Sequence, residues 1–428
     1  MPSKSEKHSE DRFHHPKIYT PYRENKLSPL FRWRGSVIPK VLPQTIFITI
    51  LAVTVTALYQ YTDIKLSIKP TFISIIGFIV SLLLGYRTNT AYDRYWEGRR
   101  LWSTLVVSIR NLVRCIWVNV KETEPKHLLE KKTAINLLLG FAVSVKHYLR
   151  EEDGIDHPDL KPYITNIKSS LPAFHPLDKN NYKKKPSGFK KWFSHSISTS
   201  ELGGDCENIV NHNLPLEISF YLSSYIRQQK INNSTDDSTI SIMYNNLCTL
   251  TDCLSSLERV LRSPIPLAYS IHLAQTTWLY CLSLPFQLVS DNGWITIIIT
   301  FFVTLILLGV EAIANEIENP FGKDENDLDL DDFCGILKLE LVNIVAHKAP
   351  SMDDWVYSLE NHPFETDSIT ATEAKHLNIN EVRSILEEDN RRLSARSEKR
   401  SRNSTSDSDG SDGSDTLNQN EISIHVDS

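Results

Sequence analysis

Four apolar blocks interrupt an otherwise polar chain. They run from 41 to 61, from 70 to 86, from 264 to 289 and from 294 to 310, and none of them contains Asp, Glu, Lys or Arg. Each approaches the roughly 20 residues that a helix needs to cross a bilayer core. Short polar turns join the blocks in pairs, which predicts two membrane hairpins. A buried helical pair in a soluble protein would give a similar pattern, although the length and the lack of charge favour the membrane.

The segment from 71 to 100, TFISIIGFIVSLLLGYRTNTAYDRYWEGRR, joins an apolar half to a charged half at residues 85–87. A helix that runs through this join without a break should either cross a membrane into a packed soluble region or line a pore. Phe78, Leu82 and Tyr86 are spaced i, i+4, i+8 and therefore share one helical face. In an oligomer that face could build stacked apolar rings that gate by dewetting. Ordinary packing or lipid contact explains the spacing as well, and the spacing alone favours this plainer explanation.

The polar regions define the remaining organisation. Lys and Arg are abundant before the first block, after the second and before the third, and sparse in the two turns, so both termini and the long middle are expected in the cytosol. The predicted regions are a cytosolic arm (1–40), a hairpin (41–86), a helical cytosolic region with a proline-broken loop near 150–200 (87–262), a second hairpin (263–318), an acidic loop with helices (319–390) and a disordered tail (391–428). The tail is predicted disordered because it has few apolar residues to bury.

Composition narrows the function. The 428 residues carry 46 basic and 52 acidic side chains, a net charge of -6, which argues against a nucleic-acid partner. The six cysteines form no CxxC pair, so neither a disulfide framework nor a zinc site is expected from them. The start of the chain has no apolar core of a secretory signal, which leaves the plasma membrane as the default location. Catalytic motifs such as GxSxG, HExxH and the P-loop are absent, so we expect transport rather than an enzyme.

Basic residues cluster below the apolar half of the 71–100 segment. Arg87, Arg94 and Arg99 outnumber their acidic neighbours, and an inner vestibule with this bias would concentrate anions. Anchoring at the lipid interface and ion pairing, for example of Arg94 with Glu97 at i+3, explain these charges equally well.

Three segments together carry a resemblance to a known family. GYRTNTAYDRYWEGRRLW, SPIPLAYSIHL and ENPFGKDENDLDLD occur in the order found in the bestrophin-like channels, and the chain resembles the bacterial and fungal branch over roughly residues 30–375. The resemblance implies an all-α membrane protein with four transmembrane helices per subunit that continue into a helical cytosolic region. It also implies a homopentamer around one central pore, with Phe78, Leu82 and Tyr86 as the neck and chloride or small organic anions as permeants. Membrane lipid and the other subunits are then its partners.

The resemblance implies two further sites. A cytosolic aperture should fall on the helix that precedes SPIP, near Ser238, Ile240 and Ile242. Animal members hold calcium just after the fourth span, and the matching positions here are the carboxylates of Asp324 and Asp327 with the backbone carbonyls of Glu316 and Asn319. Hard oxygen ligands of this kind suit calcium, although a solvated acidic loop or a helix cap is an alternative. In this chain Lys323 and Asn326 replace acids that the animal members carry.

No cofactor is required for the expected activity, and calcium is the one candidate ion. Two alternatives to an anion channel stay open at this level: a cation-selective channel of the same fold, and a non-conducting membrane scaffold that binds partners with its cytosolic region and tail.

Overall fold

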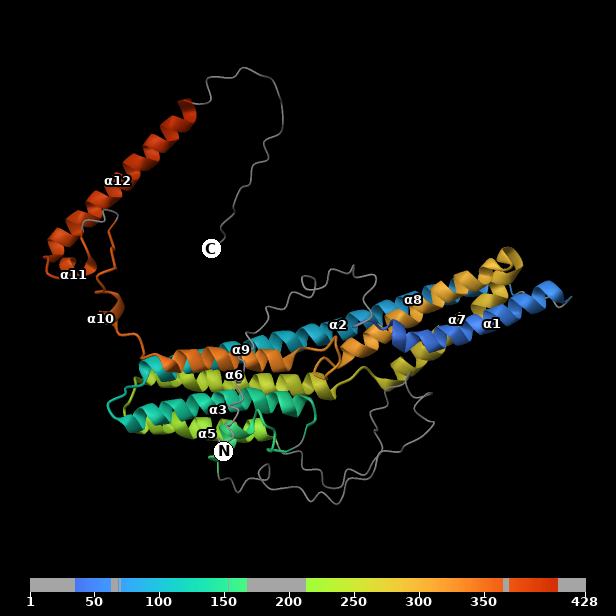
Figure 1. Cartoon of the computed structure of the whole chain (residues 1–428), viewed down its shortest axis with the longest axis horizontal. Coiled ribbons are helices and arrows are strands. Elements are labelled where there is room, and N and C mark those ends of the chain that lie inside the picture. The colour runs from blue at the N-terminus through green and yellow to red at the C-terminus, as the bar shows by residue number, and fades with distance from the viewer. Residues whose placement is uncertain are drawn as a thin grey trace, which may run out of the picture. The chain divides into compact units, whose positions relative to one another are not determined.

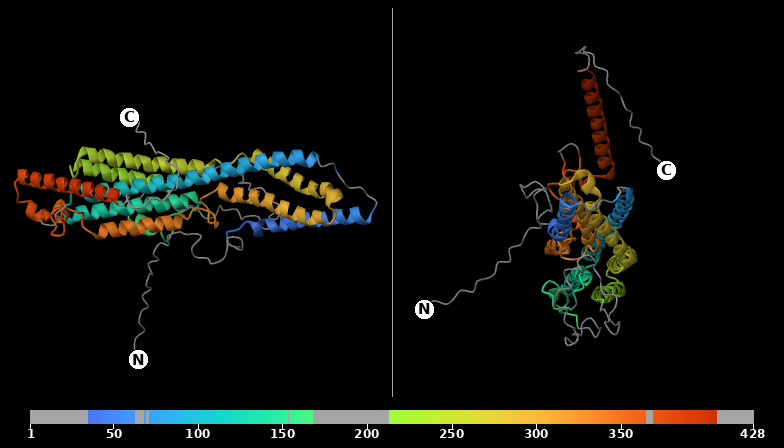
Figure 2. Two further views of the ribbon diagram at one scale, coloured as in Figure 1. Left: turned by 90° about the horizontal axis from the view of Figure 1, so that it is seen from above. Right: turned by 90° about the vertical axis from the view of Figure 1, so that its right-hand side faces the viewer.

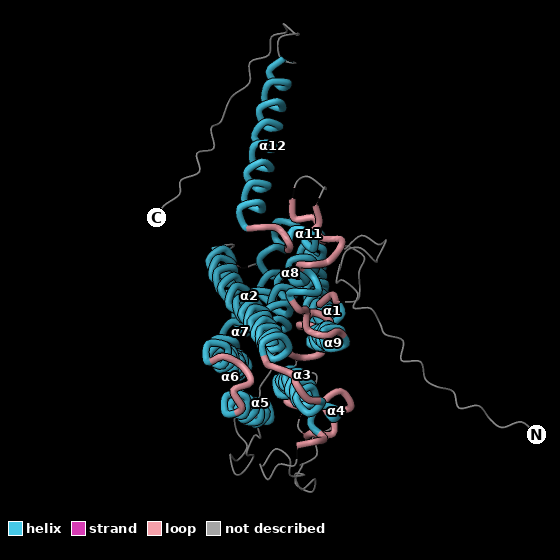
Figure 3. Tube along the Cα trace, turned by 90° about the vertical axis from the view of Figure 1, so that its left-hand side faces the viewer, coloured by secondary structure: helices cyan, strands magenta, loops and turns pink. Residues whose placement is uncertain are grey.

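The computed structural model describes residues 35–62, 68, 71–152, 154–167, 213–364 and 369–406. Within these residues every regular element is helical and no strand is present (Figure 3). The chain divides into two units, Met1–His347 and Lys348–Ser428, each with its own internal contacts. Most of the proline-broken loop expected near 150–200 lies outside the described residues, as does the N-terminal arm up to residue 34.

The first unit is a bundle of long helices with two ends (Figures 1 and 2). At one end α1 (Ile38–Tyr61) packs on α7 (Leu267–Asn292) and α8 (Ile295–Glu318), which in turn pack on the N-terminal half of α2 (Thr71–Arg114). At the other end its C-terminal half packs on α6 (Asp237–Arg262), and the bundle is completed by α3 (Pro125–Leu149), α5 (Leu214–Ile231) and α9 (Leu330–Ala346). A π-helix, η2 (Cys115–Asn119), and the single turn α4 (Lys161–Ile164) are the shorter elements.

The helix α2 crosses the join between the apolar and charged halves without a break, as predicted. Its 44 residues correspond to about 66 Å at the rise of an α-helix. No proline interrupts it. Just after the join, the hydroxyls of Thr88 and Thr90 donate back to the carbonyls of Leu84 and Tyr86. One rigid element therefore connects the apolar end of the unit to its polar end.

Large apolar side chains at the first end point both inward and outward. Ile48, Cys281 and Leu308 form one buried cluster, while Phe302 and Ile306 are more than half exposed. Outward apolar side chains of this kind are expected where lipid replaces water. Among the described residues, three helices are long and apolar enough to cross a membrane, Ile38–Tyr61, Ile73–Asn119 and Ile295–Glu318.

The predicted third span corresponds to α7, which packs against the other three helices of this end but is less apolar. Its sequence includes Gln275, Gln287 and several hydroxyl residues, and it carries an internal proline, Pro285. A hairpin of α7 and α8 joined at Gly293 is present, whereas the crossing of a membrane by α7 stays a prediction.

The polar end has an ordinary globular core. Trp102, Phe141 and Leu138 are almost completely buried there. The ammonium of Lys131 is buried as well, and it donates to the carbonyl of Trp117 at 3.2 Å and pairs with Glu122 at 3.0 Å. These two contacts connect α3 to the π-helix that ends α2 and to the loop that follows it.

The second unit corrects one prediction. Besides the single turns α10 (Met352–Trp355) and α11 (Ala371–Ala374), it contains α12, Ile379–Ser406, so the part of the tail from 391 to 406 is helical and not disordered. The residues from 407 onward lie outside the described ones. The shortage of apolar residues predicted disorder, but salt bridges at i, i+4 favour a helix. Two such bridges, Glu387 to Arg391 and Glu388 to Arg392, lie where the predicted disordered tail begins.

Candidate functional site

The three predicted neck residues lie exposed on one side of α2. Phe78 is 72 % exposed, Leu82 is 65 % and Tyr86 is 63 %. The opposite side of the same helix is packed, since Val80 and Leu84 are buried in a cluster with Leu273 of α7. The face is therefore free of the subunit's own packing and available to lipid or to other subunits.

Tyr86, at the end of this face nearest the charged half of α2, has a defined orientation. Its ring meets the ring of Tyr269 edge-to-face, with centroids 5.6 Å apart. The hydroxyl of Tyr269 donates to the carbonyl of Leu83 at 2.8 Å, which fixes this second ring against α2. A neck built on α2 would consequently end on a ring held in place by α7.

Arg87 corrects the prediction of a vestibule charge. Only 4 % of the residue is exposed, and its guanidinium donates to Asn315 and lies 3.6 Å from the carboxylate of Glu318. A buried, paired arginine of this kind holds α2 to the C-terminal end of α8. The sequence alone did not reveal this pairing, because both partners of Arg87 lie more than 220 residues further along the chain, and the charge was therefore predicted to face the vestibule.

Arg94 is committed to backbone carbonyls. Its Nε donates to the carbonyl of Glu318 at 3.0 Å, one terminal nitrogen donates to Val260 at 2.6 Å, and the other donates to Ser263. These carbonyls belong to the C-terminal ends of α8 and α6, where backbone acceptors have no partner within the helix. One guanidinium thus caps two helices, and its charge suits the negative end of both dipoles.

Two further charges of this segment are also engaged. The guanidinium of Arg99 lies over the ring of Phe333 at 4.4 Å and donates to Ser103 at 2.7 Å. The carboxylate of Glu97 accepts from Arg259 of α6 at 2.6 Å, and not from Arg94 as its spacing had suggested. Within one subunit, ion pairing and helix capping therefore account for most of these charged residues, and an anion-concentrating vestibule is not needed to explain them.

Two of the three motif segments pack directly on each other. A Cβ on Gly98 would lie 3.0 Å from ring atoms of Phe321 and 3.3 Å from Pro320. Phe321 is fully buried, so the absence of a side chain at residue 98 is what admits the loop after α8 against α2. This contact positions the acidic loop that follows.

The acidic loop is closed by its own side chains. Asp327 accepts from the backbone N–H of Asp324 at 2.6 Å, and the backbone of Leu328 returns to the carbonyl of Pro320 at 2.9 Å. The side chain of Asn319 accepts from the backbone of Phe321 at 3.4 Å.

A lysine from the start of α1 reaches into this loop. The ammonium of Lys40 donates to Glu316 at 2.5 Å and lies 3.8 Å from Asp324. The amide of Asn326 donates to the same glutamate at 2.6 Å and to the carbonyl of Gly35 at 3.2 Å. The residue that replaces an acid here, Asn326, is thus a donor that binds α8 and the start of α1 together.

Negative charge still exceeds positive charge in the loop. The pKa of Asp327 is raised to about 6, mainly by burial and in part by the nearby carboxylates of Asp324 and Glu316, while the backbone N–H of Asp324 and the ammonium of Lys40 act against this rise. Three carboxylates around one lysine are a chemically suitable donor set for a hard cation.

The predicted cytosolic aperture is corrected at one residue. Ser238 and Ile242 are exposed on α6, but Ile240 is only 3 % exposed and points into the packed side of the helix. The phase of α6 is set by Asp236, which caps it by accepting from the backbone of Thr239 at 2.8 Å, and by the packing of the helix on α2.

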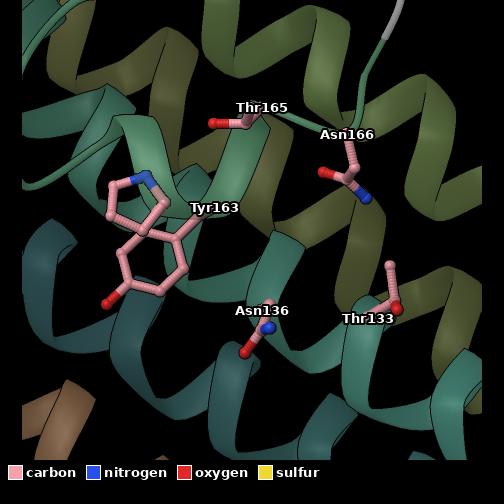
Figure 4. Close-up of a pocket in the computed structure, with 6 residues that line it drawn as sticks. Thr133, Asn136, Tyr163, Thr165 and Asn166 are labelled. Carbon is pink, nitrogen blue, oxygen red and sulfur yellow. The ribbon is translucent and has the colours of Figure 1, made fainter.

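Two features were not found by sequence reasoning. The first is a hollow of about 300 Å³ between α3 and the residues after α4, lined by neutral polar groups, whose side chains Figure 4 shows. Its lining residues are Thr133, Asn136, Pro162, Tyr163, Thr165 and Asn166. The second is a group of His147, Glu152 and His157, whose ligand atoms all lie within 4.8 Å of one another. The signal for this group was its density, two histidines and several acids within 13 residues of sequence.

Comparisons with known proteins agree on one family. The profile described as Bacterial/Fungal Bestrophin protein matches residues 18–343. A voltage-dependent anion channel-forming protein of Nostoc is 40% identical over 321 residues, which cover 74% of this chain and 90% of the relative, and one of Synechocystis is 36% identical over the same lengths. A crystal structure of a bacterial bestrophin homologue from Klebsiella pneumoniae shares the fold, with a TM-score of 0.55, 24% identity and coverage of 72% of this chain and 100% of that chain.

Proposed function

We propose that this chain, which belongs to the bacterial and fungal bestrophin family and is an anion channel-forming membrane protein, conducts anions through a neck on α2. The neck consists of Phe78, Leu82 and Tyr86, contributed by each subunit of a homopentamer around a central axis. Four helices of each subunit, α1, α2, α7 and α8, cross the membrane, and the permeants are chloride or small organic anions. The termini lie in the cytosol, and the plasma membrane holds the channel.

One observation carries the neck. The three side chains form an exposed apolar row on a continuous helix whose other side packs on α7 at Val80 and Leu84. An anion that passes such a row loses part of its water, and the ring edges of Phe78 and Tyr86 offer partial positive charge in exchange. Leu82 contributes only apolar surface, so it narrows the neck without attracting the ion.

The test is reconstitution of the full chain into liposomes with a salt gradient. We expect a reversal potential of the sign given by anion flux, and an altered conductance or selectivity when Phe78, Leu82 and Tyr86 are replaced by Ala. A cation-selective channel would reverse the sign, and a membrane scaffold would give no current.

A matched control exists on α8. Ile298, Phe302 and Ile306 are also spaced i, i+4, i+8 and are 58%, 55% and 62% exposed. Their replacement by Ala removes a comparable apolar row from another helix of the same end, and should leave selectivity unchanged. Equal effects from the two triple variants, or none from the first, would remove the neck assignment.

The acidic loop is proposed as a calcium site. Glu316, Asn319, Asp324 and Asp327 supply oxygen ligands, and the neighbouring carboxylates that help to raise the pKa of Asp327 support the binding of a cation there. Calcium would supply two positive charges to a loop that is packed on Gly98 of α2. Within this chain, Lys40 already neutralises Glu316, so the lysine and the ion compete for the same carboxylates.

A further inference from the structure

The loop after α3 folds back on the end of that helix. His147 lies in the last turn of α3, and the backbone N–H of Glu152 donates to its carbonyl at 2.9 Å. The reversal uses Glu151 in the left-handed region, with φ of 54°. Further along the loop, the carbonyl of His157 accepts from the backbones of Leu160 and Lys161, which fixes the main chain of the second histidine.

The side chains of this loop converge on the ring of His147. Its Nδ1 lies 2.7 Å from Oε2 of Glu152, and its Nε2 lies 2.9 Å from Oδ1 of Asp159. The ring of His157 stacks on it, with centroids 3.9 Å apart and an angle of 11° between the planes. The Nε2 atom of His157 is buried and has no hydrogen-bond partner among the described residues.

We propose that His147, Glu152 and His157 bind a divalent transition metal ion of the zinc type. The ligands are Nδ1 of His147, Oε2 of Glu152 and Nε2 of His157, and water completes a tetrahedron. Two imidazoles and one carboxylate are a donor set that zinc accepts readily. The unsatisfied nitrogen of His157 is then the group that the metal satisfies.

The surroundings fit this ligand set. With the metal on Nδ1 of His147, its Nε2–H donates to Asp159, and such a carboxylate behind a metal-bound histidine fixes the ring and its tautomer. The outer oxygens of the two carboxylates are already held: Lys323 pairs with Oε1 of Glu152, and Lys146 donates to Oδ2 of Asp159 at 2.5 Å. Both carboxylates can therefore keep these partners when the metal binds.

The movement required is small and local. Bonds of about 2.0–2.1 Å from zinc place two tetrahedral ligands about 3.3 Å apart. The contact of 2.7 Å between His147 and Glu152 must open by a fraction of an ångström. The ring of His157 must also rotate out of the stack, because the lone pair of an imidazole lies in the ring plane and two stacked rings cannot both aim at one ion.

Both ring nitrogens of His147 face carboxylate oxygens, so a metal on Nδ1 takes the place that faces Glu152 and leaves the contact of Nε2 with Asp159 intact. Since Lys323 belongs to the acidic loop, this site is joined by one ion pair to the proposed calcium site.

The experiment measures metal binding by the purified full-length channel in detergent. After treatment with a chelator, the protein is titrated with Zn²⁺ and with Co²⁺ at pH 7.5, the metal content is determined by mass spectrometry, and Co²⁺ is followed by its visible absorption. We expect one ion per chain, with the intense visible bands of tetrahedral Co²⁺. His157→Gln and Glu152→Gln should each weaken the affinity at least about tenfold, the scale on which metal sites lose affinity when supporting groups are removed.

His376→Gln is the matched control, because His376 is exposed in the second unit. It should retain full binding. His157→Gln alters a half-buried loop side chain, and the elution profile of each variant shows whether the channel is intact. The proposal is overturned if an intact wild-type channel binds no metal at micromolar concentration, or if His157→Gln and Glu152→Gln bind as tightly as the control. Neither result depends on whether the channel conducts anions.

Discussion

Arg94 should contribute more to stability than any other exposed or half-buried charge of α2. Replacing it by Ala removes three hydrogen bonds from a charged group to the carbonyls of Val260, Ser263 and Glu318. Bonds of this type contribute about 1.5–3 kcal/mol each. Since water can reach part of the site and the three bonds share one guanidinium, their loss should amount to about 3–5 kcal/mol rather than their sum. Arg94→Lys keeps the charge near both helix ends but cannot reach three carbonyls, and should lose about 2 kcal/mol.

The assay is the temperature at which the detergent-solubilised channel leaves its size-exclusion peak. At about 2 °C per kcal/mol for a large domain, Arg94→Ala should lower this temperature by about 6–10 °C and Arg94→Lys by about half as much. Arg100→Ala is the control, because Arg100 lies exposed on the same helix. A surface change of this kind should alter stability by less than about 0.5 kcal/mol. If Arg94→Ala matched Arg100→Ala, the capping role inferred from the three bonds would be refuted.

Three further predictions concern the acidic loop and its seat on α2. Gly98→Ala places a methyl group 3.0 Å from the buried ring of Phe321 and should destabilise the channel by about 1–3 kcal/mol in the same assay. A methyl group added by Gly85→Ala meets nothing within 4 Å, so this control variant should be neutral or stabilising. Equal melting temperatures of the two variants would contradict the packing of residue 98 on Phe321. Burial raises the pKa of Asp327 to about 6, above its value in an unfolded chain, so its charge reduces stability increasingly as the pH rises from about 4 past 6. The gain in melting temperature from Asp327→Asn should therefore be larger at pH 7.5 than at pH 5, and a gain independent of pH would be evidence against it. Lys40→Met removes the ammonium that competes for the loop and should tighten calcium binding measured by calorimetry, while unchanged or weaker binding would show that the lysine does not compete.

Much of the fold follows from the length and charge of the apolar blocks. Blocks with no charge and strongly apolar side chains predicted α1 within a few residues and the start of α8, which continues past the fourth block to Glu318. The apolar and charged halves of the 71–100 segment predicted one continuous helix, and α2 contains both. The prediction is weaker at α7, whose hydroxyl and amide residues lower its hydropathy, and wrong at 391–406, where charge pairs on a helix outweigh the shortage of apolar residues. Local composition determines both the low hydropathy of α7 and the helix at 391–406, so both features can in principle be predicted from the sequence.

The contacts of the site were harder to predict, because they join residues far apart in the chain. Lys40 meets Glu316 across 276 positions, and Arg94 meets Glu318 across 224. No periodicity within one helix indicates which distant carbonyl an arginine will cap. The face on which a residue lies also depends on the partner helix: Ile240 and Ile242 are equally apolar, and only the packing of α6 on α2 places the first inside and the second outside.

The inward side of α2 nevertheless contains a signal that a search for apolar stripes overlooks. Its inward positions follow one another every three or four residues through both halves of the helix, at buried Val80, Leu84, Arg87 and Ala91, half-buried Arg94, and buried Gly98, Trp102, Leu105 and Ile109. The stripe changes from aliphatic to charged and small, and then to aromatic and aliphatic again, but its period does not change. Extending the period across Arg87 predicts a buried arginine in need of an acid, which the structure supplies as Glu318. The same extension leaves Phe78, Leu82 and Tyr86 on the outward side, so one unbroken period separates the residues that hold the subunit together from those proposed to meet the ion.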